Sequence, residues 1–304
     1  FLTIKNTLPE FFWVTNYLET LLSAVTWKPI TNATIAREFR ILVDEYAELT
    51  GCSDSPTDLQ CHDFSMRGLS FVEDSVFSSL GHMTYFNGTD SMPVKQALKY
   101  FYDADPMTGV TVPATEHSVM CMGSKDKEID TFERLLKLYP AGIVSIVSDT
   151  WDFWKVLTSY TVLLKELIES REDITDADGN VLVPGRTVFR PDSGDPVKIL
   201  TGYKPSEYLE SNGSYYCRKT GKELAEHEVK GAVEVLYDIF GGSETENGFK
   251  VLNSSVGLIY GDSITLHRCE AIMARLAAKG FASCNAVFGI GSYTHQYNTR
   301  DTPG

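Results

Sequence analysis

Six short apolar runs, each ending in a charged residue or a glycine, most constrain what this chain can fold into. They alternate with longer stretches of helical periodicity, an alternation typical of parallel βα units. Because the carboxyl ends of parallel strands meet on one face, six such ends would converge on a single site. An α/β barrel is the first prediction and a doubly wound sheet the second. The runs cover residues 60–64, 111–117, 143–149, 187–192, 256–262 and 285–291.

The regions around these runs suggest how the chain is organised. Residues 1–50 show helical periodicity in two stretches and predict two packed helices that lead into the barrel. Residues 51–304 would form the barrel, with a surface insertion around one helix at about residues 203–250, where the sequence is polar and rich in turns. Residues 176–180 predict a hairpin turn. The crossover helices are predicted over residues 92–102, 127–138, 152–169, 224–240 and 265–279.

Composition and charge exclude several classes of protein. A hydrophobic fraction of 43% is ordinary for a globular chain, and no apolar stretch approaches the roughly 20 residues that a membrane span needs. The net charge of -14 argues against non-specific binding to nucleic acid or to an anionic membrane. The six cysteines are scattered without a CxxC pair, which favours reduced, mostly buried thiols. We therefore expect a soluble, cytoplasmic protein.

Two of the strand ends combine residues that suit a phosphorylated sugar. Arg190 offers a guanidinium for an anion, and Asp192, two residues later, offers a carboxylate for hydroxyl groups. Gly291 and Ser292 end another run with small residues that expose backbone N–H groups to a phosphate, and Arg300 follows nine residues after Gly291. From these segments alone, a strand-end salt bridge and a solvated surface arginine remain equally good interpretations.

A histidine and several acids occur at further strand ends. His117 could act as a base, an acid or a phosphoryl acceptor if a carboxylate fixes its tautomer, and either Glu116 or Asp149 could do so. Asp149 and Asp262 could also bind sugar hydroxyls or Mg²⁺. A histidine with a purely structural hydrogen bond, and acids that only cap strand ends, are the alternatives.

The segment His62–Gly68 places an aromatic ring and a guanidinium three residues apart at one more strand end. A flat heteroaromatic ring could stack on Phe64 while Arg67 reaches a phosphate. Packing of Phe64 in the core is the alternative. The other histidines have no comparable group of candidate site residues near them in the sequence.

Taken together, these motifs resemble the nicotinamide phosphoribosyltransferases, which are type II phosphoribosyltransferases, in the same order and at similar spacing over nearly the whole chain. The resemblance implies an irregular (β/α) barrel preceded by part of a second, N-terminal α+β domain. It also implies that the chain is a fragment lacking its N-terminal region and its C-terminal end. The motifs are HDFSMRG at 62–68, FNGTDS at 86–91, VPATEHS at 112–118, SIVSDTWD at 145–152, FRPDSGDP at 189–196, YGD at 260–262 and FGIGSYTHQYNTRD at 288–301.

The activity implied by the resemblance is phosphoribosyl transfer from phosphoribosyl pyrophosphate to nicotinamide in NAD salvage. The products would be nicotinamide mononucleotide and pyrophosphate, with Mg²⁺ as cofactor, although its ligands are not identifiable from the sequence. ATP would be a co-substrate whose hydrolysis is coupled to synthesis through a phosphohistidine. The partner would be a second copy of the chain, in a homodimer with sites at the subunit interface.

The resemblance also implies roles for individual residues around the base. Phe64 would stack on the nicotinamide ring, and Asp90 would accept a hydrogen bond from the carboxamide N–H₂ group while repelling the carboxylate of nicotinate. Thr111, Ser145 and Arg190 would complete the pocket around the base.

The remaining implied roles concern the sugar, the phosphates and ATP. Asp192 and Asp262 would bind the ribose hydroxyls. His117 would be the phosphorylated histidine, held by Glu116 and Asp149. The phosphates would be bound by Gly261, Gly291, Ser292, Arg67 and Arg300, although Ser292 replaces a glycine found in some members of the family.

Three other functions remain open at this point. A nicotinate phosphoribosyltransferase would need a cationic or neutral pocket where Asp90 stands. A metal-dependent barrel lyase would use Asp149, Asp192 and Asp262 as metal ligands. A non-catalytic binding protein would keep the fold without needing His117.

Overall fold

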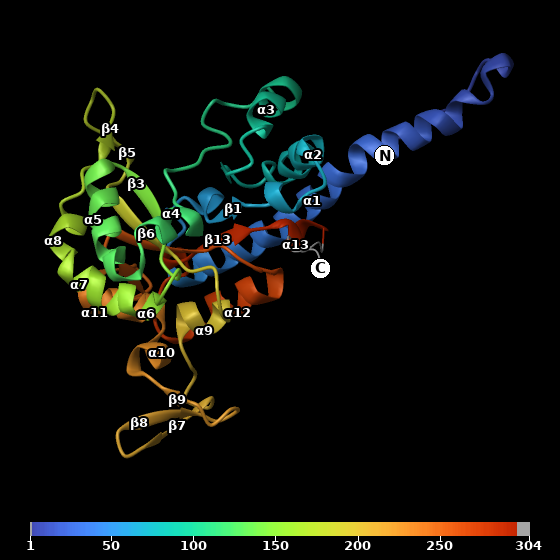
Figure 1. Cartoon of the computed structure of the whole chain (residues 1–304). Helices are drawn as coiled ribbons and strands as arrows, with labels where there is room; N and C mark the ends of the chain where they lie inside the picture. The colour runs from blue at the N-terminus through green and yellow to red at the C-terminus, as the bar shows by residue number, and fades with distance from the viewer. Residues whose placement is uncertain (1, 297–304) are drawn as a thin grey trace.

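The computed structural model describes residues 2–296 of the 304-residue chain and centres on a six-stranded parallel sheet (Figure 1). The neighbouring strands pair in parallel throughout, and apolar side chains such as Ile146, Phe189 and Phe288 are buried along them. In spatial order the strands are β2 (Gly88–Thr89), β1 (Cys61–Asp63), β13 (Val287–Ile290), β12 (Val256–Tyr260), β6 (Arg186–Arg190) and β3 (Ile143–Val147).

An extended segment joins the two edges of this sheet. Val110 bridges in parallel to Gly88 on β2, and Ala114 bridges in parallel to Ser145 on β3. Backbone hydrogen bonds accompany both bridges, from Thr89 N–H to Val110 at 3.0 Å and from Thr115 N–H to Ser145 at 3.0 Å. The sheet therefore curls into the irregular α/β barrel expected from the sequence.

The prediction that residues 111–117 form a strand is wrong. Pro113 has no N–H group for a ladder, and the segment touches each neighbouring strand at one bridge only. It then turns into helix α4 (His117–Met122), so that His117 starts a helix and does not end a strand. The other apolar runs all contain strands of the sheet, whereas the two-residue strand β2 was not predicted.

The prediction of two packed N-terminal helices is also wrong, because Val14–Thr50 is one continuous helix, α1, with Pro29 inside it. Close packing against α2 (Val72–His82) carries the helix past the proline: a side chain on Gly81 would collide with the carbonyl of Pro29, and Asn32 donates to Ser78 at 2.6 Å. The helix ends at Gly51, in the left-handed region with φ of 70°.

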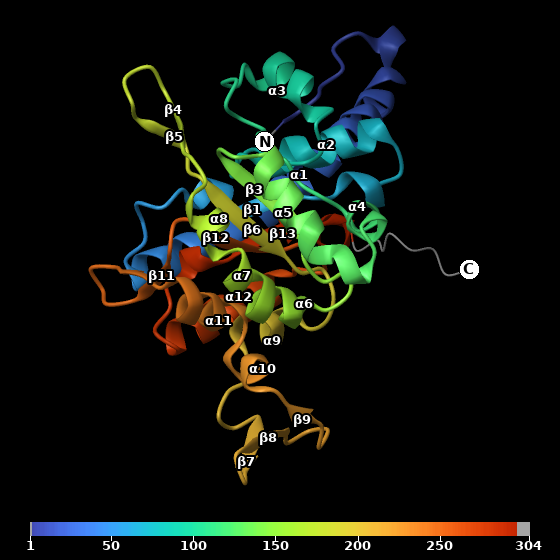
Figure 2. The ribbon, with the colours of Figure 1, turned by 60° about the vertical axis from the view of Figure 1, so that its left-hand side comes forward.

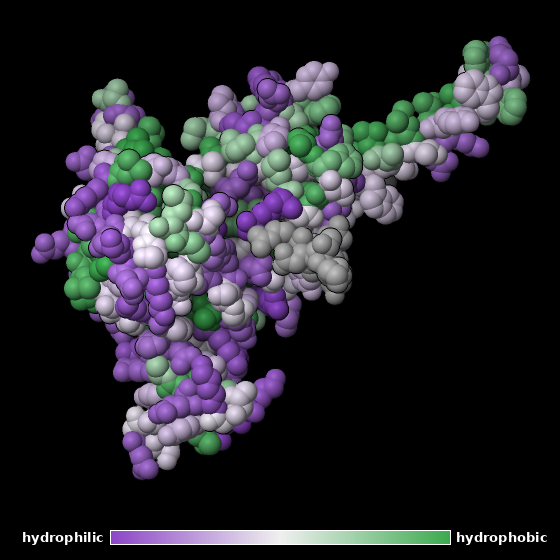
Figure 3. Space-filling view, viewed as in Figure 1, coloured by the Kyte–Doolittle hydropathy of each residue, from purple (hydrophilic) through white to green (hydrophobic). Residues whose placement is uncertain are grey.

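The two halves of α1 differ in their surroundings. The C-terminal half buries one face, including Ala36, Phe39 and Val43, against the barrel, while the N-terminal half projects away from it (Figure 1). Apolar residues along the projecting half are exposed (Figure 3). No helix within residues 2–296 is long and apolar enough to cross a membrane.

Helices cover the outside of the sheet as crossovers, and α9, α11 and α12 gather together on one side of it (Figure 2). The predicted helix over residues 152–169 is interrupted by a π-helical turn at Val156–Tyr160. Apart from α1, α2, α4 and the two helices α10 and α11 described below, the α-helices of residues 2–296 are α3 (Val94–Tyr102), α5 (Glu128–Leu138), α6 (Phe153–Lys155), α7 (Thr161–Leu163), α8 (Lys165–Glu169), α9 (Pro196–Thr201), α12 (Leu266–Ala278) and α13 (Ser292–Gln296).

The predicted insertion is present but contains more than one helix. It projects from the body as an antiparallel sheet of β7 (Tyr208–Ser211), β8 (Ser214–Cys217) and β9 (Glu223–Leu224), as Figures 1 and 2 show. Gly231, with φ of 83°, divides the predicted helix over 224–240 into α10 (Glu226–Lys230) and α11 (Ala232–Phe240). Two hairpins complete the fold. One pairs β10 (Gly242–Glu244) with β11 (Lys250–Leu252). The other pairs β4 (Ile174–Thr175) with β5 (Val181–Val183) and confirms the predicted hairpin turn at residues 176–180.

Candidate active site

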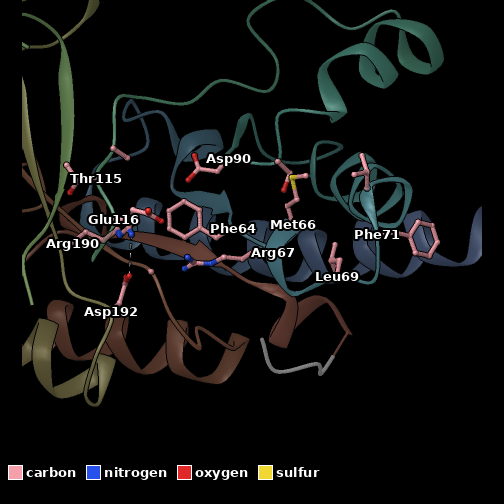
Figure 4. Close-up of a pocket in the computed structure, with 14 residues that line it drawn as sticks. Phe64, Met66, Arg67, Leu69, Phe71, Asp90, Thr115, Glu116, Arg190 and Asp192 are labelled. Carbon is pink, nitrogen blue, oxygen red and sulfur yellow. Dashed lines mark hydrogen bonds and ion pairs between the residues drawn. The ribbon is translucent and has the colours of Figure 1, made fainter. Parts of the chain in front are cut away.

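A cavity of about 640 Å³ opens at the carboxyl ends of β1, β6 and β12 (Figure 4). Many of the predicted site residues line it together, although they come from distant parts of the sequence. The lining residues named in advance are Phe64, Arg67, Asp90, Glu116, Arg190, Asp192 and Gly261, and the additional ones are Met66, Leu69, Phe71, Val72, Ser91, Ala114 and Thr115.

Phe64 forms one wall of the cavity, directly after β1, where its N–H donates to Ile290 at 2.9 Å. Its ring rests on two glycines, because a side chain on Gly289 would collide with it and one on Gly261 would touch it at 3.4 Å. The Arg190 guanidinium lies 5.7 Å from the ring centroid. The half-buried ring is thus fixed against strand ends while remaining in contact with the cavity, as stacking on a flat ligand requires.

Arg190 and Asp192 form a second, more polar wall at the end of β6. The Arg190 Nη2 atom lies 3.4 Å from Asp192 Oδ2, whereas Arg190 Nε and Asp192 Oδ1 are buried without a hydrogen-bond partner within residues 2–296. Burial raises the pKa of Asp192, and Asp149 adds to this, while Arg190 opposes it. A buried acceptor without a donor is costly, so a hydroxyl-bearing ligand would stabilise this carboxyl group.

Asp90 stands at another edge of the cavity and is held by two donors. His62 Nε2 lies 2.9 Å from Asp90 Oδ1, and the Thr111 hydroxyl donates to the same oxygen at 2.6 Å. Burial acts to raise the pKa of Asp90, but the hydrogen bonds from His62 and Thr111 and the charges of His62 and Arg190 outweigh it and lower that pKa. Asp90 is therefore an ionised acceptor at neutral pH.

His117 and Asp149 meet next to the lining residues Glu116 and Asp192, with His117 Nε2 3.2 Å from Asp149 Oδ1. The His117 side chain is 49% exposed, whereas that of Asp149 is 4% exposed. Asp149 Oδ2 also accepts from the Asp192 N–H at 3.0 Å and from the Ser193 hydroxyl at 2.5 Å, which ties the His117 partner to the Asp192 loop. Of the two acids predicted to hold His117, the structure brings Asp149 to it, while Glu116 accepts from the Ser118 hydroxyl.

The other predicted residues lie around the cavity or outside the described part of the chain. Ser145 is buried within β3, and Asp262 is exposed after β12, where it accepts from Ser263 at 2.7 Å. Gly291 precedes α13, and Ser292, its first residue, packs so closely on Gly68 that a side chain there would collide with it. Arg300 lies outside the described residues.

A buried polar cluster next to Phe64 had no role among the predictions from the sequence. Asp63, which is fully buried at the end of β1, accepts from the Ser65 N–H at 3.0 Å, the Ser79 hydroxyl at 2.5 Å and the Thr89 hydroxyl at 2.9 Å. His295 Nδ1 lies 4.0 Å from Asp63, so the cluster connects β1, α2, β2 and α13. The pairing of His62 with Asp90 was also missed, and its only signal was that His62 adjoins the Phe64 motif.

The acids near the cavity do not make a ready metal cluster. Within the described chain, no group of three or more histidine, cysteine, aspartate or glutamate side chains is arranged to hold a metal ion. Asp149 and Asp192 are linked through a backbone N–H, and Asp262 is hydrogen-bonded to its neighbour Ser263. The ligand set that a metal-dependent lyase would need is therefore not formed by these three residues.

Comparisons with known proteins place the chain in one family. The family model described as the nicotinate phosphoribosyltransferase (NAPRTase) family matches residues 59–304. A nicotinamide phosphoribosyltransferase of Acinetobacter baylyi is 52% identical over 304 residues, which cover 100% of this chain and 56% of that protein. One from Mycoplasma pneumoniae is 33% identical over 97% of this chain and 57% of its own length. The chain thus spans about half the length of the curated relatives it matches.

Proposed function

The chain belongs to the nicotinate phosphoribosyltransferase (NAPRTase) family, and we propose that the complete protein transfers the phosphoribosyl group of phosphoribosyl pyrophosphate to nicotinamide, for NAD salvage. The observation that carries the choice of nicotinamide is Asp90, an ionised acceptor held at the edge of the cavity that contains Phe64. An anionic acceptor suits the N–H₂ group of a carboxamide and repels the carboxylate of nicotinate.

The base would bind against the Phe64 ring with its carboxamide toward Asp90. Gly261 and Gly289, on which the Phe64 ring packs, fix the position of that ring. Arg190, whose guanidinium lies 5.7 Å from the ring centroid, can donate a hydrogen bond to the amide oxygen of the base. Thr111 would act through Asp90 by fixing its carboxylate. Ser145, predicted to complete this pocket, remains a prediction.

The sugar phosphate would bind beside the base along the Arg190–Asp192 wall. The unpartnered Oδ1 atom of Asp192 supports a role in accepting a ribose hydroxyl, and Gly261 leaves room for that oxygen because a side chain there would collide with it. Arg67, exposed at the cavity rim, supplies positive charge for a phosphate. The roles of Asp262, Gly291, Ser292 and Arg300 stay predictions.

In the reaction, the bond between the anomeric carbon and pyrophosphate breaks, and the pyridine nitrogen forms the new bond from the opposite face. The positive charge that develops on the sugar ring is stabilised by the nearby carboxylates, and the two partners are aligned by the walls described above. Mg²⁺ usually keeps its waters and shares substrate phosphates with one or two carboxylates, so Asp192 fits this role, and the bound ion would neutralise the leaving pyrophosphate.

ATP coupling through His117 is a further part of the proposal. When Asp149 accepts a hydrogen bond from the Nε2–H group of a neutral His117, the lone pair lies on Nδ1. That nitrogen can form a bond to the γ-phosphorus of ATP while the bond from phosphorus to the ADP oxygen breaks. Water then hydrolyses the phosphohistidine to inorganic phosphate and restores the neutral imidazole.

A homodimer in the cytoplasm would provide the setting for this chemistry. The exposed apolar side chains along the N-terminal half of α1, among them Leu18, Leu21 and Leu22, support burial against another subunit. Figure 3 shows hydrophobic residues along this projecting segment. All six cysteines are free, which agrees with a reducing compartment.

The decisive test is turnover of radiolabelled nicotinamide by the complete protein with phosphoribosyl pyrophosphate and Mg²⁺, with and without ATP. We expect nicotinamide mononucleotide to form, ATP to raise its yield, and nicotinate to be used poorly. The substitution Asp90→Asn removes the negative charge and should lower the ratio of kcat/KM for nicotinamide over nicotinate by at least about tenfold. A wild-type preference for nicotinate would establish the rival phosphoribosyltransferase instead.

A further inference from the structure

His62 lies beside the proposed base pocket without a role in the function described so far. It is the middle residue of β1, two residues before Phe64, and its side chain is 13% exposed. The imidazole packs edge-on against the Phe64 ring, with 5.1 Å between the ring centroids. Its Nε2 atom lies 2.9 Å from Asp90 Oδ1, so one histidine touches both residues that would recognise the base.

The position of this imidazole is fixed from a third side by β2. His62 pairs with Gly88 in the parallel register of β1 and β2, and a side chain on Gly88 would collide with His62 Nδ1. With Phe64 on one side, the β2 backbone on another and Asp90 at its tip, the ring has little freedom to move. A rigid donor therefore points at Asp90.

The hydrogen bonds of Asp90 are unequally divided between its two oxygens. His62 and Thr111 both bond to Oδ1, at 2.9 and 2.6 Å, and no residue within 2–296 donates to Oδ2. Because the Asp90 side chain is 40% exposed, it would be free to rotate without these donors. Two donors on one oxygen fix the carboxylate plane and leave the other oxygen available to a ligand.

We propose that His62 is a positioning residue for base selection: it holds Asp90 so that Oδ2 accepts the carboxamide N–H₂ group and opposes a carboxylate. Donation from His62 Nε2 to Oδ1 keeps Asp90 an ionised acceptor, whose negative charge opposes the carboxylate of nicotinate. This inference rests on the proposed function, and it assigns the specificity to the pair of His62 and Asp90.

The test compares His62→Gln with His62→Asn in the complete protein. The glutamine amide nitrogen reaches about as far as Nε2 of histidine, whereas the asparagine amide is one methylene shorter and does not reach Asp90. We measure kcat and KM for both nicotinamide and nicotinate, with His267→Ala, an exposed histidine at the start of α12, as the matched control.

We expect His62→Asn to lower the ratio of kcat/KM for nicotinamide over nicotinate by at least about tenfold, mainly through a higher KM for nicotinamide. His62→Gln should keep the ratio within about threefold of wild type, and Thr111→Val, which removes the other donor to the same oxygen, should shift it in the same direction as His62→Asn. Thermal unfolding checks that each variant is folded, and His62→Leu replaces His62→Asn if that variant is not.

The outcomes separate this inference from the function beneath it. If wild type forms no nicotinamide mononucleotide, the proposed function fails. If wild type forms it but a folded His62→Asn or His62→Leu variant keeps the wild-type ratio, the positioning role of His62 is overturned while the function stands. An equal loss of selectivity in His62→Gln and His62→Asn would also overturn the positioning role, because the glutamine amide should still donate to Asp90 and preserve the selectivity.

Discussion

Besides His62 and Asp90, two further histidine–aspartate pairs lie close to residues of the cavity, and they differ in what surrounds them. In the outer pair, His117 and Asp149 are 3.2 Å apart, with the histidine side chain 49% exposed. In the inner pair, His295 and Asp63 are 4.0 Å apart, and both side chains are 0% exposed. One of these pairs is therefore partly exposed next to the candidate active site, and the other is enclosed inside the protein.

The acid of the inner pair has its hydrogen bonds satisfied by the protein, whereas His295 Nε2 is buried without a partner within residues 2–296. Burial alone would raise the pKa of Asp63, but the neighbouring His295 and His82 rings and the hydrogen bonds from Ser65 and Ser79 outweigh it, so that pKa is lowered. Burial lowers the pKa of His295 to about 4, and the inner pair is a carboxylate beside a neutral imidazole. Such a pair holds elements together but has no access to a substrate.

The outer pair leaves one ring nitrogen of His117 open, while its acid anchors the Asp192 loop. Enclosure by the protein thus distinguishes a histidine–aspartate pair available for chemistry from one that fixes the fold. This distinction predicts large effects on stability for changes to the inner pair and small ones for changes to His117.

The largest effect is expected for Asp63→Ala. Removing a fully buried carboxylate leaves the Ser79 and Thr89 hydroxyls and the Ser65 N–H without their acceptor. We expect the free energy of unfolding to fall by about 3–5 kcal/mol, measured by urea denaturation at pH 7. Asp149→Ala is the matched outer change and should cost about 1–2 kcal/mol. Equal losses for the two variants would contradict the contrast between the pairs.

A second expected effect is a loss of stability in mild acid caused by His295. Its pKa is about 4 in the folded protein and near its ordinary 6.5 in the unfolded chain, so between these values the unfolded chain binds a proton that the folded chain does not. The free energy of unfolding should therefore fall as pH is lowered from 6.5 toward 4, by up to roughly 3 kcal/mol from this group. The pKa of His82 is also lowered by burial and adds in the same direction.

Urea denaturation of wild type and His295→Gln across pH 4–8 measures this contribution. The variant lacks the titrating group, so the difference in stability between wild type and variant should shrink or reverse as pH falls below 6.5. A pH dependence unchanged by His295→Gln would show that the inner histidine does not carry the effect.

Residues near the cavity and residues inside the protein also differ in how well they could be predicted from the sequence. The strand ends that carry Phe64, Asp149 and Asp192 could be predicted, because each follows an apolar run with a recognisable motif. The contact of His295 with Asp63 could not, since the two residues lie far apart in the chain and neither belongs to a periodic pattern that reports on the other. Only the packing of α13 against α2 and β1 brings them together.

Local patterns also failed where tertiary contacts determine the backbone. The continuity of α1 through Pro29 depends on its packing with Gly81 and Ser78 in α2, which periodicity within residues 1–50 does not report. The segment around Pro113 reads as a strand because it is apolar, yet it joins the barrel through a single bridge to each neighbour. His62 was overlooked because its partner, Asp90, belongs to another motif.

The smallest effect on stability is expected for His117→Ala, which should change the free energy of unfolding by less than about 0.5 kcal/mol. The side chain is half exposed, and the Asp149 carboxylate keeps its hydrogen bonds from the Asp192 N–H and the Ser193 hydroxyl when the histidine is removed.

The effect of His117→Ala on the reaction should, in contrast, be large. ATP should no longer raise the yield of nicotinamide mononucleotide, and no acid-labile phosphate should appear on the protein after incubation with γ-labelled ATP. Urea denaturation and phosphate labelling of the same preparation measure both. If His117→Ala destabilised the protein as much as Asp63→Ala does, the outer pair would also stabilise the fold. A histidine that acts only in the reaction contributes little to the free energy of unfolding.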